Sequence, residues 1–158
     1  MNENKQLPLR TGVGIILLNS ENNVFVGKRI DNPKNSWQMP QGGVEQNENF
    51  LQAAKRELEE ETGIKSAELI KELDGWFKYD LPIYLLGKLW GDKYRGQKQK
   101  WFVMKFLGKS DEINVKTKNP EFFDWKWIKL SKLPNVAVHF KVDIYKKIKE
   151  ELTYLRLN

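Results

Sequence analysis

The sequence predicts an α+β fold in which helices cover a central mixed β-sheet. Two observations support this class. Apolar or alternating runs typical of strands recur along the chain, most clearly at 13–18 and 24–29. Two other segments, 49–63 and 138–155, repeat apolar residues at helical spacing. With 158 residues and 40% hydrophobic content, we expect a single domain spanning 1–158.

The chain is expected to open with an arm and a hairpin. Residues 1–9 are predicted to form a flexible arm. The apolar run 13–18 suits a buried strand, and a polar turn at 20–23 leads into the second hairpin strand at 24–29. Residues 37–43 then form a short extended piece, interrupted by one proline and two glycines.

The mid-chain helix has clear start and stop signals. Asn49 is a good N-cap, and Gln52, three residues later, can complete a capping box. Gly63 is a plausible stop, because glycine readily adopts the left-handed conformation that ends many helices. Good helix formers and no proline lie between them. The sequence therefore predicts one helix bounded by Asn49 and Gly63.

The second half of the chain is expected to contain four strands and a terminal helix. The strands are placed at 66–73, 76–80, 100–107 and 123–128. Residues 87–96 are interpreted as a loop and 108–120 as irregular. Trp125 and Trp127 share one strand face and are expected to pack in the core. Apolar residues from 138 to 155 recur at helical spacing.

Composition excludes several classes of site. The chain has no cysteine, so disulfides, thiolate metal sites and a cysteine nucleophile are excluded. The first ten residues lack the apolar core of a signal peptide, and no apolar run approaches the roughly 18 residues of a membrane span. We therefore expect a cytoplasmic protein. The net charge of +6 favours an anionic partner such as RNA or a polyphosphate.

Three glutamates share one face of the predicted helix. Glu57, Glu60 and Glu61 stand at positions i, i+3 and i+4, and so project to the same side. Like charges at this spacing repel one another. A solvated acidic face is the common interpretation of such a cluster. A hard divalent cation would offset the repulsion, because it prefers carboxylate oxygens.

The surrounding stretch resembles the Nudix box, Gly-x5-Glu-x7-Arg-Glu-U-x-Glu-Glu-x-Gly-U, where U is a bulky aliphatic residue. Its nine fixed positions are filled by Gly42, Glu48, Arg56, Glu57, Leu58, Glu60, Glu61, Gly63 and Ile64. This resemblance to the Nudix hydrolase family implies an α/β/α sandwich around a mixed sheet. It also implies two or three Mg2+ or Mn2+ ions that help water attack a phosphoanhydride.

Outside the box, the chain resembles the bacterial RNA pyrophosphohydrolases, close kin of the diadenosine polyphosphate hydrolases. The resemblance is carried by RTGVG, WQMPQGG, GQKQKWF, PEFFDWKW and HFKVDIY, at 10–14, 37–43, 96–102, 120–127 and 139–145. GQKQKWF is distinctive of this branch. Together with the box, these segments cover about residues 10 to 150.

The resemblance assigns roles to individual residues. Catalytic and metal-binding roles fall to Glu57, Glu60, Glu61 and Glu121, with the Gly42 backbone beside the metals. Substrate-binding roles fall to Arg10, Arg29, Gln41, Gln97, Lys98, Lys100, Phe140 and Lys141. Strand alternation sends only about half of residues 97–100 toward the site, and core packing is the rival interpretation for Phe140. Arg56 can pair with Glu60, Glu48 could orient the metal cluster, and His139 is not expected to be catalytic.

The expected activity is conversion of 5′-triphosphate RNA ends to 5′-monophosphate ends, which promotes mRNA decay. Hydrolysis of diadenosine tetra- or pentaphosphate is the alternative within the same chemistry. An inactive RNA-binding module is the alternative from another class, and the intact acidic cluster argues against it. The expected partner is the RNA or dinucleotide substrate, with no membrane and no obligate protein partner inferred.

Overall fold

A computed structural model describes residues 7–31 and 35–155 of the chain. The strands are β1 (Leu9–Leu18), β2 (Val24–Arg29), β3 (Gln41–Gly43), β4 (Ala67–Glu72), β5 (Phe77–Asp80), β6 (Gly96–Phe106) and β7 (Phe122–Ile128). The helices are α1 (Phe50–Thr62), α2 (Leu133–Val136) and α3 (Val142–Tyr154). Single 3-10 turns lie at Ile83–Leu85, Trp90–Asp92, Ser110–Glu112, Leu130–Lys132 and His139–Lys141.

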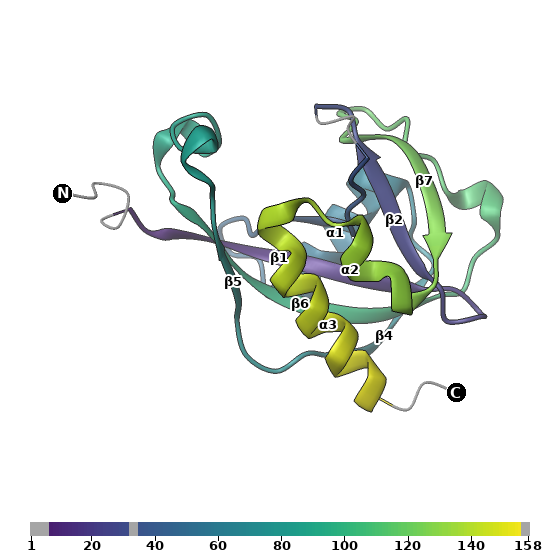
Figure 1. Ribbon diagram of the computed structural model, residues 1–158. Helices are drawn as coiled ribbons and strands as arrows, with labels where there is room; N and C mark the ends of the chain where they lie inside the picture. The colour runs from purple at the N-terminus through teal and green to yellow at the C-terminus, as the bar shows by residue number, and fades with distance from the viewer. Residues whose placement is uncertain (1–6, 32–34, 156–158) are drawn as a thin grey trace.

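The strands form one mixed sheet. Its main path runs β4-β6-β1-β2-β7, while β3 pairs with β1 and β5 pairs with β6. β1 and β6 are parallel and pair from Leu9 opposite Gly96 to Leu18 opposite Lys105. The other pairs are antiparallel, including the predicted hairpin of β1 and β2. The long parallel pair is therefore the centre of the sheet (Figure 1).

Both faces of the sheet are covered, which gives the expected α/β/α layers. Figure 1 shows α1 on one side and α2 and α3 on the other. The continuous apolar run of β1 suits this arrangement, because a central strand must be apolar on both sides. Val13, Ile15 and Leu17 pack toward α1, while Ile16 and Leu18 pack toward α3. Each layer thus has its own core.

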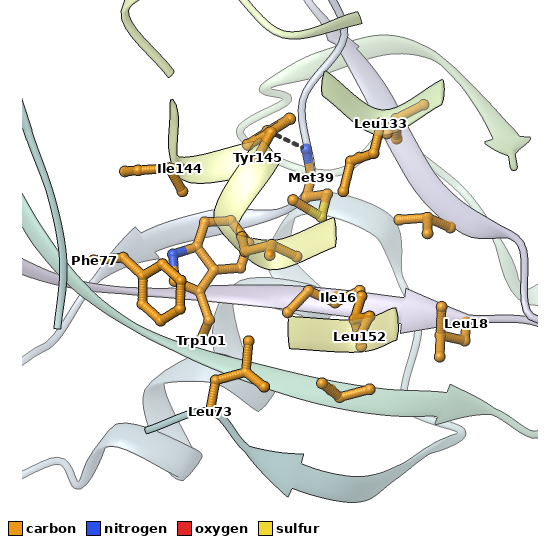
Figure 2. Close-up of a cluster of buried hydrophobic side chains, with 14 of the residues drawn as sticks. Ile16, Leu18, Met39, Leu73, Phe77, Trp101, Leu133, Ile144, Tyr145 and Leu152 are labelled. Carbon is orange, nitrogen blue, oxygen red and sulfur yellow. Dashed lines mark hydrogen bonds between the residues drawn. The ribbon is translucent and has the colours of Figure 1, made fainter. Parts of the chain in front are cut away.

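The core under α3 is built around two large rings. Trp101 on β6 and Tyr145 on α3 are fully buried, with ring centroids 6.4 Å apart (Figure 2). The Tyr145 hydroxyl accepts a 2.8 Å hydrogen bond from the backbone N–H of Met39. A buried tyrosine needs such a partner for its polar end. This bond ties α3 to the chain just before β3.

Helix α1 has the predicted boundaries. Asn49 and Gln52 form the reciprocal capping box, and Gly63 ends the helix with a φ of 74°. Ala53, Ala54 and Leu58 are buried against the sheet. This anchoring fixes which side of the helix faces β3 and the part of β1 that pairs with it.

Several boundaries differ from the sequence-based expectations. β1 begins at Leu9 and β6 at Gly96, each four residues earlier than predicted, because the two strands extend as a parallel pair through polar residues. α2 was not predicted, since a four-residue helix containing proline leaves no periodic signal. The terminal helix begins at Val142, after a 3-10 turn. Trp125 and Trp127 both contact Phe25 and are partly buried, as expected.

Residues 1–6 of the predicted arm lie outside the described residues. The remainder of the arm is held against the start of β6. Arg95 donates its backbone N–H to Pro8 O at 3.1 Å and its side-chain Nε–H to Leu7 O at 3.0 Å. None of the described helices combines the length and apolar character needed to cross a lipid bilayer.

Candidate active site

A pocket of about 900 Å³ opens where β1, β3, α1 and the turn before α3 meet. This volume is within the usual range for a small-molecule site. Of the predicted site residues, its lining includes Arg10, Arg29, Gln41, Gly42, Glu57, Glu61, Gln97, Glu121, Phe140 and Lys141. The other three, Glu60, Lys98 and Lys100, do not line it. The pocket thus collects residues from distant parts of the sequence.

The Gln41–Gly43 strand passes very close to helix α1. A Cβ atom added to Gly42 would overlap the Glu57 carboxylate, and one added to Gly43 would overlap the Arg10 guanidinium. Only glycine lets the backbone approach both charged groups so closely. The two glycines therefore allow a carboxylate and an arginine to face the same short strand.

Arg56 connects the loop before α1 to the acidic face of the helix. Its Nε–H and Nη2–H groups donate to the two oxygens of Glu48, at 2.7 and 2.9 Å. Nη2 also donates to Gly43 O at 2.8 Å, while Nη1 donates to Glu57 at 2.9 Å and Glu60 at 3.2 Å. The predicted pairing of Arg56 with Glu60 is confirmed. The planar guanidinium holds several acceptors at once, which a lysine could not do.

Glu61 is the most buried acidic group of the site. Its residue is only 4% exposed, and Oε2 has no hydrogen-bond partner. Burial raises the pKa of Glu61 well above its usual value, and the charges of Glu57 and Glu121 raise it further. Burial also raises the pKa of Glu57, against the opposing effect of Arg56. The protein alone therefore leaves the buried Glu61 carboxylate without a hydrogen-bonded cation, while Glu57 shares Arg56 with Glu48 and Glu60.

This shortage of positive charge fits a bound cation. Within residues 7–31 and 35–155, no three acidic or imidazole side chains are gathered closely enough to form a complete metal site. Mg2+ does not need one, because it usually keeps several waters and uses one or two carboxylates. Glu57 and the unpartnered oxygen of Glu61 are the residues that fit this role best. Glu60, in contrast, is 57% exposed and does not line the pocket.

Glu121 lies on the opposite rim, beside Arg29. The Arg29 guanidinium donates two hydrogen bonds to Asp31, at 2.7 and 2.6 Å, and lies 3.6 Å from the Glu121 carboxylate. The backbone supports this placement, because Ile30 N–H donates to Glu121 O at 3.0 Å. Asp31 is the main cause of a raised pKa for Arg29. The Arg29 charge is thus fixed at the edge of the acidic group.

Alternation along β6 divides residues 97–100 between the two faces of the sheet. Gln97 and Gln99 are buried on the pocket side, where Gln99 donates to Gln97 at 3.1 Å and to Gln41 at 3.2 Å. Lys98 and Lys100 point to the α1 side, with their ammonium groups 4.9 and 4.7 Å from the Trp76 ring centroid. Substrate binding by these two lysines stays a prediction that their position off the pocket does not support.

An aromatic and cationic wall faces the carboxylates. The rings of Tyr79 and Phe140 lie 5.7 Å apart, and the Lys141 ammonium is 5.6 and 5.9 Å from their centroids. Lys141 is 6% exposed and donates to Gln38 at 3.2 Å. Burial and the Arg29 charge lower the pKa of Lys141 to about 7. Burial raises the pKa of Tyr79 to about 12.

Sequence reasoning missed several lining residues. The sequence predicts a strand at Tyr79 but no role in the site, although its alternation with charged Lys78 and Asp80 indicates that its side chain points inward. Trp90 lines the pocket with Arg10 5.4 Å from its ring, within a segment interpreted only as a loop. That segment is the teal curl beyond β5 in Figure 1. It carried no periodic signal that would have located Trp90.

The sequence matches the NUDIX domain family over residues 8–150. It is 60% identical over 153 residues to a protein of Pelagibacter ubique named RNA pyrophosphohydrolase, covering 96% of this chain and 97% of that protein. A Rickettsia canadensis protein of the same name is 45% identical, covering 94% and 92% of the two chains. The chain therefore belongs to the NUDIX domain family, whose hydrolases generally use a divalent metal ion.

Solved structures agree on the fold. The E. coli dihydroneopterin triphosphate pyrophosphohydrolase superposes with a TM-score of 0.69 at 18% identity, covering 92% of this chain and 99% of that one. A C. elegans Ap4A hydrolase gives a TM-score of 0.62 at 19% identity, covering 90% and 98%. At these identities the likeness concerns architecture. It confirms the predicted α/β/α sandwich.

Proposed function

We propose that this chain is a metal-dependent pyrophosphohydrolase that converts the 5′-triphosphate end of RNA to a 5′-monophosphate. One observation carries the proposal: a single pocket holds Glu57 and the buried, unpartnered carboxylate of Glu61 on one wall, and arginine, lysine and aromatic rings on the other. Relatives at 60% and 45% identity bear the name RNA pyrophosphohydrolase. We assign the activity to one domain spanning 1–158.

We assign metal binding to the acidic wall of the pocket and phosphate binding to its arginines. Glu57 and Glu61 would hold Mg2+ or Mn2+, which supplies charge neutralisation and a more acidic bound water when present. Glu121 is proposed to assist from the rim of the pocket, and Glu60 from outside its lining, beside Arg56. Arg10 and Arg29 neutralise phosphate oxygens, and the dense charge of a triphosphate matches this set.

The nucleoside end belongs on the aromatic wall. Phe140 offers a ring on which a base can stack, and Lys141 offers a nearby donor. Gln41 and Gln97 face the same space and can orient the substrate through hydrogen bonds. The product would be an RNA with a 5′-monophosphate end, and we place this step of mRNA decay in the cytoplasm.

The paired rings of Tyr79 and Phe140 also suit a second adenine, so diadenosine polyphosphate hydrolysis is the alternative function. A substrate panel with Mg2+ or Mn2+ separates the two. Triphosphorylated RNA, diadenosine tetraphosphate and nucleoside triphosphates are compared by kcat/KM. We expect triphosphorylated RNA to have the highest value. A higher kcat/KM for diadenosine tetraphosphate would overturn the proposal in favour of the alternative.

A further inference from the structure

The pocket extends beyond Phe140 to a tryptophan on its outer wall. Trp37 lines the pocket together with Asn135 and Val136. Its backbone N–H donates to Val136 O at 2.8 Å, which fixes it beside α2. Trp37 is only partly buried, so part of the residue is accessible from the pocket rim. Trp37 therefore offers a ring at the side of the pocket next to α2.

Two lysines from neighbouring strands converge on the Trp37 ring. The Lys126 ammonium on β7 is 4.3 Å from the ring centroid, and the Lys28 ammonium on β2 is 5.4 Å from it. Lys28 is also 6.0 Å from the ring of Phe123, which is 49% exposed. We call Lys28, Trp37, Phe123 and Lys126 the exit patch. It joins positive charge and exposed ring surface at the pocket rim.

The charges of the exit patch are available to a ligand. Among the residues the structure describes, neither Lys28 nor Lys126 has a carboxylate within ion-pair distance. Asp124, the strand neighbour of Lys28, is exposed and accepts a 2.8 Å hydrogen bond from the Trp125 backbone. A groove with free cations beside aromatic rings is the usual recognition surface for single-stranded nucleic acid.

A second tryptophan with two lysines shows why position matters. The ammonium groups of Lys98 and Lys100 lie 4.9 and 4.7 Å from the Trp76 ring centroid, but Trp76 does not line the pocket. Trp37 does. Of these two tryptophan–lysine clusters, the exit patch is the one that adjoins the pocket, through Trp37.

We propose that the RNA chain leaves the pocket over Trp37, where Lys28 and Lys126 neutralise phosphates on the 3′ side of the nucleotides held at the aromatic wall. This inference rests on the proposed RNA substrate and deepens it. A dinucleoside polyphosphate has no such continuation, so the exit patch would serve RNA alone. Lysine contacts to phosphate add affinity without reading sequence.

The test compares triphosphorylated RNAs of two, three, four and eight nucleotides that share the first two nucleotides. The variant is Lys28→Ala/Lys126→Ala. The control is Lys146→Ala/Lys147→Ala, which removes the same charge from the exposed surface of α3, where Lys147 also lies 4.4 Å from an aromatic ring. Thermal unfolding of each variant is measured in parallel. Binding without divalent metal is measured by fluorescence anisotropy on the same RNAs.

We expect kcat/KM of the wild type to rise about five- to tenfold from the dinucleotide to the octanucleotide, and the exit-patch variant to lose this rise. Each neutralised phosphate of a single strand contributes a slope of about −0.7 in log affinity against log salt, so the variant should lose a slope of roughly 1.4 with the octanucleotide. The control variant should keep both the rise of kcat/KM with RNA length and the salt slope. The exit-patch variant should turn over the dinucleotide at the wild-type rate.

The inference is overturned if kcat/KM of the exit-patch variant still rises with RNA length, or if the control variant loses this rise to the same extent. It is also overturned if kcat/KM of the wild type does not increase beyond two nucleotides. If the wild type hydrolyses no triphosphorylated RNA, the proposed function fails. The anisotropy measurement then still decides whether the exit patch binds RNA according to its length.

Discussion

The two walls of the pocket differ in how they are built and in how well their charges are satisfied. The acidic wall comes mainly from one continuous segment, 42–61, tied together by Arg56. The facing wall is assembled from β1, the end of β2, β5, β6 and the turn before α3. Glu61 retains an unpartnered oxygen, whereas Arg29 and Lys141 already have hydrogen-bond partners. The acidic wall, with its unpartnered carboxylate oxygen, is therefore suited to metal binding and hydrolysis. The facing wall, whose cations already have hydrogen-bond partners, is suited to substrate binding.

The largest effect is expected on the acidic wall. Glu61→Gln should lower kcat about 10³-fold, because metal-assisted charge stabilisation amounts to several kcal/mol. Glu59→Gln is the matched control, since Glu59 is exposed on the same helix and lies 3.7 Å from the Lys65 ammonium. Steady-state kinetics with Mg2+ and a thermal melt in EDTA check both variants. A Glu61→Gln enzyme as fast as the wild type would contradict the role of the acidic wall.

A smaller effect is expected when the link within the acidic wall is weakened. Arg56→Lys should reduce kcat/KM by about 10- to 100-fold, as for other residues that orient metal ligands. An ammonium cannot reach Glu48, Glu57 and Gly43 O together. Titration of activity with Mg2+ should show a higher metal requirement. An unchanged metal requirement would assign Arg56 a purely structural role.

On the facing wall, the effect should fall on binding. Phe140→Leu should raise KM for triphosphorylated RNA by about fivefold while kcat changes less, because a stacked base contributes roughly 1–3 kcal/mol. KM and kcat measured with the dinucleotide substrate separate the two effects. A loss confined to kcat would contradict the inference that Phe140 contributes to substrate binding rather than to hydrolysis.

The smallest effect concerns stability rather than turnover. The pKa of Lys141 is about 7 in the folded protein and near its usual 10.5 when unfolded. Between these values the unfolded chain binds one more proton, so the free energy of unfolding rises with pH. Relative to Lys141→Met, the wild type should gain about 1 kcal/mol per pH unit from pH 7.5 to 9.5. Chemical denaturation at several pH values measures this difference, and parallel pH profiles would contradict it.

The acidic wall was predictable because its signals are local. The capping box, the stop at Gly63 and the spacing of Glu57 and Glu61 all lie within one helix, where periodicity fixes direction. The mixed sheet and most of its strands also followed from apolar patterns. The burial of Glu61 relative to Glu60 could not be predicted, since it depends on how the helix is rotated against the sheet.

The facing wall was only partly predictable, because tertiary pairing creates it. Gln97 and Gln99 belong to a central strand, but their polarity concealed that strand's start. The alternation of residues 97–100 shows that two of the four side chains face the pocket, but it does not show which two. The positions of Lys98 and Lys100 beside Trp76 therefore required the structure. Trp90 came from a segment without periodicity, so only its contact with Arg10 revealed it.

The parallel pairing of β1 with β6 places Arg10 beside Gln97 across a long separation in sequence. Because side chains alternate along a strand, one inserted residue within 97–100 would exchange its glutamines and lysines between the two faces. An insertion within 82–94 would leave that register intact. Insertions or deletions before Gly96 can therefore change the shape of the pocket mouth without altering the pairing of β1 with β6. A one-residue insertion just after Gly96 would disrupt the pocket lining.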